Sequence, residues 1–208
     1  MREGTTTMTT PADPQSGRDL KTLLNWRTVD IVVAAVIGVA VGIVFWLWSA
    51  LWSATTGLFA FFPPAQAVLY GMWMVPGVLG GLIIRKPGAA LLTSLAAASL
   101  EMVLGTAWGT AVLVSGALQG LLSELAFLAL GYRRWGMGAA VLAGVAGGIS
   151  PAIRDNITSH ITWPLSHQIA YGVIVLISAG VIAGMGSRVL TTRLAAAGAL
   201  APFPSARG

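Results

Sequence analysis

Cysteine is absent from the 208 residues, which excludes disulfide bonds, thiolate nucleophiles and thiolate metal ligands. Charge is scarce as well, because charged residues make up 9% of the chain, against about 25% in ordinary globular proteins. Apolar side chains make up 56%, and the mean hydropathy is +0.80. A water-soluble fold of this size needs many more charges to cover its surface. The composition therefore excludes a soluble enzyme and predicts an integral membrane protein.

Sequence motifs for catalysis and energy coupling are also missing. The chain has no Gly-rich phosphate loop, no nucleophile elbow and no paired His and Glu at zinc-binding spacing. We therefore expect no ATP hydrolysis, no other enzymatic activity and no cofactor. The basic residues are spread along the chain, so the pI near 10.5 does not indicate nucleic-acid binding. His160 and His167 beside a single aspartate are too few ligands to predict a metal site.

Six apolar stretches lie between two polar tails. They cover residues 29–52, 67–84, 89–104, 110–130, 137–152 and 169–190. Each approaches the ~17–25 residues that cross a bilayer, and all are rich in Gly and Ala, as are helices that pack closely in lipid. The expected fold is an all-α, six-transmembrane-helix bundle over residues 26–194. Residues 1–25 are expected to form a disordered tail, and residues 195–208 a loose one.

Basic residues predict the orientation of this bundle. They gather in every second connection: Arg18, Lys21 and Arg27, then Arg85 and Lys86, then Arg133 and Arg134, then Arg188 and Arg193. The opposite loops contain only Arg154. Because loops rich in Lys and Arg stay in the cytoplasm, both termini are predicted to be cytoplasmic.

Aromatic residues concentrate at the opposite, outer side. The outer set is Trp46, Trp48, Trp52, Tyr70, Trp73, Trp108, Trp163 and Tyr171. One interpretation is a belt of rings at the lipid headgroups, but a belt should populate both membrane interfaces. The outer excess therefore leaves a second interpretation open, in which some rings line a site for a flat or cationic ligand.

Polar side chains within the apolar stretches are the other candidates for a site. An intramembrane carboxylate costs about 2.5–3.5 kcal/mol and normally faces the bundle interior with a partner. For Glu124 and Gln119, a hydrogen bond between helices is as good an interpretation as ligand binding. Glu101 stands at the depth of the outer aromatic residues beside small side chains, which favours ligand binding.

Two further patterns are ambiguous. Ala34, Gly38 and Gly42 form a small-residue stripe, which fits either packing within the bundle or contact with a partner helix. The polar outer segment 151–168 is expected to be a loop, in which Arg154 beside Asp155 forms a local ion pair.

One third of the chain resembles a known family. The similar residues are Tyr70-Gly71-Met72-Trp73, Arg85-Lys86-Pro87-Gly88-Ala89-Ala90, Glu101, Gly105-Thr106-Ala107-Trp108-Gly109, Gln119-Gly120, Glu124 and Tyr132-Arg133-Arg134. In order and spacing, residues 69–134 resemble the YkoE-like family, the substrate-binding (S) subunits of energy-coupling factor (ECF) transporters for thiamine or its hydroxymethylpyrimidine (HMP) precursor.

The resemblance implies a multi-pass protein of the prokaryotic cell membrane that captures thiamine or HMP from outside. It also implies a transmembrane coupling subunit and two cytoplasmic ATPases as partners. In many S subunits a small-residue stripe on the first helix contacts the coupling subunit. The resemblance therefore assigns Ala34, Gly38 and Gly42 to that interface.

With such a ligand, the resemblance implies a role for several of the outer residues. Glu101 can accept a hydrogen bond from the pyrimidine amino group or compensate the thiazolium cation. The rings of Trp46, Trp73, Trp108 and Trp163 can stack on the ligand, and Tyr70, Gln119 and Asn156 can satisfy its polar atoms. The sequence leaves the choice between thiamine and HMP open. A stand-alone secondary transporter of a small aromatic or cationic solute is the alternative function, although its expected two-halved repeat is missing.

Overall fold

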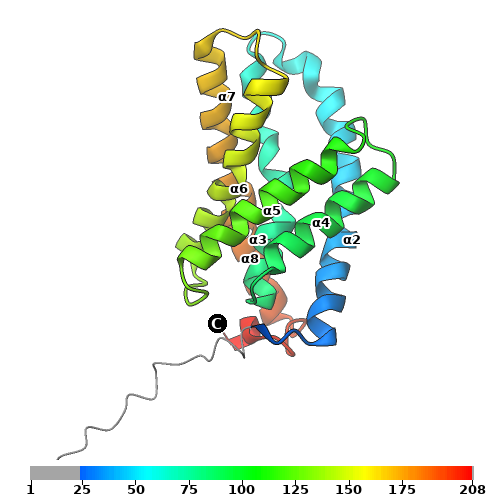
Figure 1. Ribbon diagram of the computed structural model, residues 1–208, viewed down its shortest axis with the longest axis vertical. Coiled ribbons are helices and arrows are strands. Elements are labelled where there is room, and N and C mark those ends of the chain that lie inside the picture. The colour runs from blue at the N-terminus through cyan, green and yellow to red at the C-terminus, as the bar shows by residue number, and fades with distance from the viewer. Residues whose placement is uncertain (1–23, 208) are drawn as a thin grey trace, which may run out of the picture.

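The computed structural model describes residues 24–207, so nearly all of the predicted N-terminal tail lies outside the described residues. Every regular element in this part of the chain is helical (Figure 1). The elements are α2 (Thr28–Thr55), η1 (Thr56–Phe59), η2 (Pro63–Met74), α3 (Val75–Ile84), α4 (Ala89–Val103), α5 (Ala111–Ala129), α6 (Met137–Thr158), α7 (Leu165–Ser178), η3 (Ala179–Gly186), α8 (Ser187–Ala196) and η4 (Pro204–Arg207).

These elements combine into the six predicted membrane helices. Five continuous helical segments are long and apolar enough to cross a bilayer: Thr28–Phe59, Pro63–Ile84, Ala111–Ala129, Met137–Thr158 and Leu165–Ala196. The shorter apolar α4 is the sixth. The second segment begins as the 3₁₀ helix η2, and the last contains the π-helical stretch η3 between α7 and α8. The six-helix fold is therefore confirmed.

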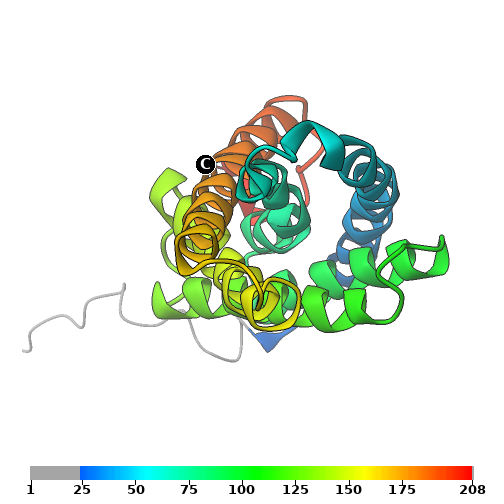
Figure 2. The same cartoon turned by 90° about the horizontal axis from the view of Figure 1, so that it is seen from above.

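Helix α3 is the centre of the bundle, with the other helices arranged around it (Figure 2). Every residue from Pro76 to Ile84 is buried. Close packing here depends on glycine, because a Cβ at Gly80 would lie 2.2 Å from Oγ1 of Thr93 on α4. A Cβ at Gly81 would lie 2.3 Å from the Phe127 ring on α5. An apolar helix buried on all sides needs such small residues to let its neighbours approach.

The small-residue stripe on α2 faces inward in this chain, while its assignment to the coupling-subunit interface stays a prediction. Ala34, Gly38 and Gly42 are all buried. A Cβ at Gly38 would lie 2.3 Å from the Cβ of Ala96, and a Cβ at Gly42 would lie 2.9 Å from the backbone oxygen of Ala97, both on α4. The stripe is thus a contact surface within the chain, the other interpretation that the sequence allowed.

Helix α6 is longer than predicted. It continues through Pro151 to Thr158, so the segment expected as a loop from residue 151 is helical for two more turns. The helical spacing places Pro151, Arg154, Asp155 and Thr158 along one face. This correction matters for function, because it turns Arg154 and Asp155 from loop residues into residues on a rigid element.

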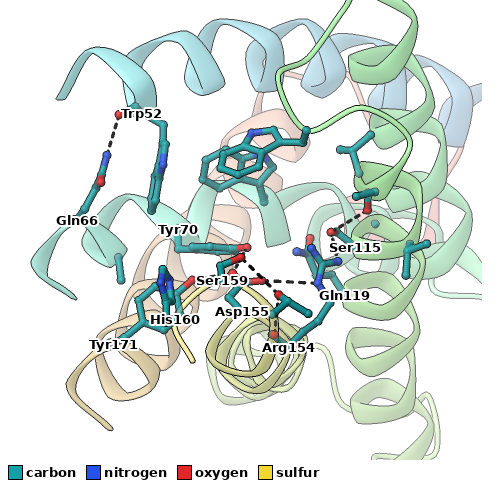
Figure 3. Close-up of a pocket in the computed structure, with 18 of the residues that line it drawn as sticks. Trp52, Gln66, Tyr70, Ser115, Gln119, Arg154, Asp155, Ser159, His160 and Tyr171 are labelled. Carbon is teal, nitrogen blue, oxygen red and sulfur yellow. Dashed lines mark hydrogen bonds and ion pairs between the residues drawn. The ribbon is translucent and has the colours of Figure 1, made fainter. Parts of the chain in front are cut away.

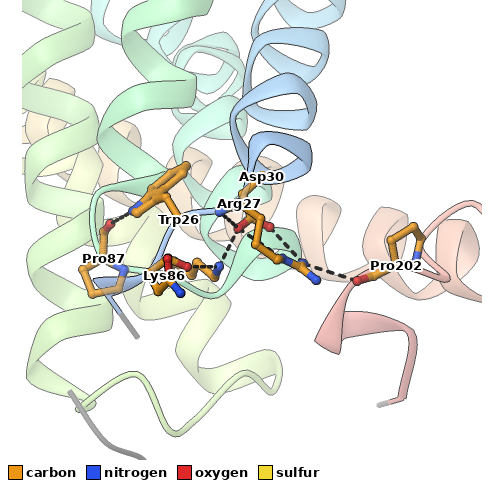
Figure 4. A network of polar contacts seen from close by, with 7 residues as sticks. Trp26, Arg27, Asp30, Lys86, Pro87 and Pro202 are labelled. Atoms are coloured by element: carbon orange, nitrogen blue, oxygen red, sulfur yellow. Dashed lines mark hydrogen bonds and ion pairs between the residues drawn. The ribbon is translucent and has the colours of Figure 1, made fainter. Parts of the chain in front are cut away.

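The two ends of the described chain meet at one end of the bundle (Figure 4). Asp30, which is fully buried, binds Lys86 and Arg27 through its carboxylate. Arg27 also donates to the backbone oxygen of Pro202 at 3.4 Å. The two ends lie on the same side of the bundle, which agrees with an even number of membrane helices. The cytoplasmic location of this side is a prediction from the basic residues.

The C-terminal segment is packed rather than loose. Leu200 and Phe203 are only 5% and 4% exposed, and they join a cluster with Leu79, Ile83 and Ile84 of the central helix. The segment after α8 therefore folds back under α3 and closes this end of the bundle. Composition alone suggested a loose tail because the few apolar side chains of this segment stand among alanine, glycine and proline residues.

Glu124 has a structural role at the same half of the bundle. Its Oε2 accepts a hydrogen bond of 2.8 Å from the backbone N–H of Ala90, in the first turn of α4, and its Oε1 accepts one from the hydroxyl of Tyr132. Since the first N–H groups of a helix have no partner within it, this carboxylate caps α4 from a neighbouring helix.

Candidate ligand-binding site

A cavity of about 670 Å³ opens at the end of the bundle opposite the chain ends. Its wall combines side chains from η2 and from helices α2, α4, α5, α6 and α7 (Figure 3). Most of the lining is apolar or aromatic, with a few polar groups among them. Its size and composition are typical of a site that encloses a small organic molecule.

Glu101 is a polar group on this wall with one carboxylate oxygen that has no hydrogen-bond partner in the described residues. Its side chain is fully buried on α4, and its Oε1 accepts hydrogen bonds from the hydroxyls of Ser49 at 2.6 Å and Thr106 at 3.4 Å. Its Oε2 has no hydrogen-bond partner within residues 24–207, although the indole of Trp73 lies beside the carboxyl group. A buried carboxylate oxygen without a partner is costly, so this atom is suited to a donor or cation on a ligand.

An aromatic cluster forms the wall next to Glu101. The rings of Trp52, Tyr70 and Trp73 are in mutual contact, with centroid distances of 5.2–5.7 Å. Trp52 comes from the outer end of α2, and the other two come from η2. The electron-rich faces of such rings attract flat and cationic groups.

Asp155 joins three elements behind this cluster. Its Oδ2 accepts hydrogen bonds of 2.7 Å from the hydroxyls of both Tyr70 on η2 and Tyr171 on α7. The aspartate itself lies on α6 and is buried. This one carboxylate therefore fixes the position of Tyr70, whose ring belongs to the cavity wall.

Arg154 introduces a positive charge into the same cavity. Its Nε lies 3.6 Å from Oδ1 of Asp155, and its Nη1 donates to the hydroxyl of Ser115 on α5 (Figure 3). The side chain is 31% exposed, so the guanidinium group lies partly open at the cavity.

His160 and Trp163 form the rim between α6 and α7. Their rings are stacked, with centroids 3.8 Å apart and planes 17° apart, and His160 also meets the edge of Tyr171. Burial lowers the pKa of His160 below its usual value, more than the nearby Asp155 raises it. The rim histidine is therefore neutral at pH 7 and stacks as an uncharged ring.

Six of the eight residues predicted for substrate binding lie around the cavity. These are Glu101, Trp73, Trp108, Tyr70, Gln119 and Trp163. Gln119 is 4% exposed, and it belongs to the cavity wall. Their roles toward a ligand stay predictions.

Trp46 and Asn156 lie elsewhere. Trp46 is 43% exposed on α2 and is not part of the cavity wall. Asn156 donates to the backbone oxygens of Ala152 and Gln168, at 2.9 and 3.0 Å, and so ties α6 to α7. The side chain of Asn156 therefore faces away from the ligand cavity.

The predicted set omitted Arg154 and Asp155. The available signal was their spacing: positions 151, 154, 155 and 158 fit one face of a helix if the helix continues through Pro151. No group of three or more His, Cys, Asp or Glu residues that could hold a metal ion exists in the described part of the chain.

Comparisons with known proteins agree on a transport family. The family described as "ABC-type cobalt transport system, permease component" matches residues 29–150. YkoE of Bacillus subtilis (strain 168), provisionally named an HMP/thiamine permease protein, is 32% identical over 177 residues, which cover 85% of this chain and 88% of the relative. A crystal structure of an S-component of an ECF transporter is 30% identical and matches with a TM-score of 0.83, covering 88% of this chain and 92% of the other.

These matches extend over nearly the whole membrane bundle, including the helices that form the cavity. They agree with the helical, multi-pass architecture. The chain therefore belongs to the YkoE-like family of ECF transporter S components, the substrate-binding subunits of importers in the bacterial plasma membrane.

Proposed function

We propose that the cavity binds thiamine or HMP through the aminopyrimidine ring that these two molecules share. The unpartnered Oε2 of Glu101 is the observation that carries the proposal. Placed in a cavity with little water, this oxygen accepts a hydrogen bond from the pyrimidine amino group more strongly than it would in bulk solvent. The provisional name of the Bacillus relative, an HMP/thiamine permease protein, supports the same ligands.

The aromatic cluster supplies the second requirement of this ligand class. Trp52, Tyr70 and Trp73 stand beside Glu101 and present ring faces and edges to the cavity. A ring stacked here gains apolar contact, and the thiazolium of thiamine adds a cation–π attraction of about 0.5–2 kcal/mol per contact. HMP, which is neutral, uses the stacking and hydrogen-bonding part alone.

Cobalt, which the family description names, is not supported as the cargo. The cavity contains Glu101, Asp155 and His160, but these residues do not form a metal-binding group in the described structure. Asp155 is already occupied by two tyrosine hydroxyls and Arg154. A largely apolar, ring-lined wall favours an organic cation over a small hydrated metal ion.

Transport requires partners in this proposal. As an S component the chain works with an ECF module; we propose that this module consists of one transmembrane coupling subunit and two cytoplasmic ATPases. The cavity then opens to the outside, and both termini face the cytoplasm. The stripe of Ala34, Gly38 and Gly42 is left out of the proposed coupling surface, because all three residues are buried and the two glycines pack against α4.

Equilibrium titration of the purified chain with thiamine and HMP, without ATP, tests the proposal. Binding of either molecule, followed by quenching of the cavity tryptophans, is the expected result. No affinity for either ligand would overturn the assignment. Reconstitution of the chain alone in liposomes separates the alternative function, because a secondary transporter accumulates its solute under an ion gradient, whereas an S component does not.

A further inference from the structure

The cavity has two charged poles, and the proposed function uses only one of them. Glu101 lies on α4 and is held from α2 by Ser49. Arg154 lies on α6 and is held from α5 by Ser115. The two side chains thus belong to different pairs of helices around one cavity. A ligand that engaged Glu101 alone would leave the arginine without a contact to the ligand.

Arg154 is held in place by its neighbours. Its Nε faces Asp155 at 3.6 Å, and its Nη1 donates to Ser115. Asp155 is fixed in turn by the hydroxyls of Tyr70 and Tyr171. These contacts use two of the three guanidinium nitrogens, Nε and Nη1, and the side chain is 31% exposed at the cavity. A guanidinium fixed on two sides and open on the third is pre-organised to donate to an oxygen atom.

We infer that Arg154 is a specificity-determining residue that donates to a terminal oxygen of the ligand while Glu101 accepts from its opposite end. This inference rests on the proposed function of the cavity. It implies that the ligand carries a donor or cation at one end and an oxygen acceptor at the other. Thiamine fits this description. Its aminopyrimidine ring carries the donor, and its second ring, the thiazolium, carries the hydroxyethyl oxygen. The phosphate ester of that hydroxyl presents the same oxygen with added negative charge.

The volume of the cavity agrees with a ligand of two rings. A space of about 670 Å³ lies in the middle of the range for drug-sized ligands. A one-ring molecule such as HMP fills less of this space than thiamine does, and it lacks the hydroxyethyl group that Arg154 is inferred to bind. We therefore expect thiamine to bind more tightly than HMP, and Arg154 to be the source of part of that difference.

A residue-by-ligand cycle tests the inference. The purified wild-type chain and the variant Arg154→Gln are each titrated with thiamine and with its analogue in which the hydroxyethyl group is replaced by ethyl. In the wild type the missing hydroxyl should weaken binding by about tenfold, as expected for a hydrogen bond to a charged group. In Arg154→Gln the two ligands should bind equally. Arg193→Gln removes the same charge at an exposed position of α8, outside the cavity, and should behave like the wild type.

The outcomes separate this inference from the proposed function. If neither thiamine nor its analogue binds to the wild type, the proposed function fails. If both bind and the hydroxyl has the same effect in wild type and Arg154→Gln, the role of Arg154 is overturned while the function stands.

Thiamine monophosphate distinguishes the two forms of the acceptor. A larger effect of Arg154→Gln on binding of the ester than on binding of thiamine identifies an oxyanion subsite, and an equal effect identifies a hydroxyl subsite. Arg154→Lys, which keeps the charge and the packing of the stem, serves if the glutamine variant does not fold.

Discussion

The hydroxyl of Ser49 donates a hydrogen bond of 2.6 Å to Oε1 of Glu101, and this bond joins α2 to α4 at the wall of the cavity. It fixes one carboxylate oxygen and leaves the other, Oε2, without a partner. The same helix pair is held together below by the close approach of Gly38 to Ala96. The geometry of the binding carboxylate therefore depends on helix packing some way from the ligand.

Replacing Glu101 with glutamine should weaken thiamine binding by at least tenfold and leave the bundle folded. The amide keeps the size of the side chain and can still accept from Ser49. It removes the negative charge and gives the ligand a weaker acceptor, a change worth about 1.5–3 kcal/mol. Each 1.4 kcal/mol is a tenfold change in Kd. Titration by tryptophan quenching measures the affinity, and an unchanged Kd would remove Glu101 from the site.

The matched change at the other intramembrane glutamate, Glu124, should lower stability and leave thiamine affinity unchanged. Glu124→Gln weakens the contacts of the carboxylate with the Ala90 N–H and the Tyr132 hydroxyl, both far from the cavity. We expect a loss of about 1–3 kcal/mol in stability and an unchanged Kd for thiamine. Thermal unfolding in detergent measures the first effect. A variant with wild-type stability would show that the cap on α4 contributes little.

The sequence predicted helix ends correctly where an apolar stretch is bounded by proline or glycine. The predicted stretch 89–104 became Ala89–Val103, and 110–130 became Ala111–Ala129. Pro87 and Gly88 precede the first, and Gly105 and Gly109 separate the two, so local chemistry was sufficient. The prediction placed the outer end of α6 too early, because a proline followed by charged residues is typical of a helix end. Here Arg154 and Asp155 find partners on neighbouring helices, which local reasoning does not reveal.

The site was only partly predictable for the same reason. Glu101 was identified because an intramembrane carboxylate needs a special environment wherever it lies. The importance of Asp155 depends on Tyr70, which lies 85 residues away in the sequence, and only the fold brings them together. The stripe on α2 shows the converse problem. Small residues indicate close approach of a helix, but their spacing does not say whether that helix is α4 or part of another subunit.

Gly38→Leu should reduce both stability and thiamine binding. Even a Cβ at this position would lie 2.3 Å from the Cβ of Ala96, so the leucine forces α2 away from α4. That movement also separates Ser49 from Glu101. Thermal unfolding and thiamine titration on the same preparation measure the two effects. Val39→Leu, on the exposed side of α2, is the control and should change neither. Normal binding with lost uptake would instead favour a contact with the coupling subunit.

His160 should make the folded bundle sensitive to mild acid. Its ring is stacked between helices against Trp163 and meets Tyr171, and burial holds its pKa below the usual 6.5. Asp155 faces the same ring and partly opposes that shift. Because the unfolded chain binds a proton on this histidine more readily than the folded chain does, acid favours unfolding. The contribution is present above pH 6.5 and is lost as the pH falls through the lower folded pKa.

Melting temperatures in detergent at pH 8 and pH 5 measure this effect. The wild type should lose more stability on acidification than His160→Gln, which stacks on Trp163 without a titratable group. Protonation also charges the rim of a cavity that receives a cation, so thiamine affinity should fall over the same pH range in the wild type and fall less in the variant. Equal pH dependence of both proteins would show that groups other than His160 control the acid response, and that the stacked pair at the rim serves only to pack α6 against α7.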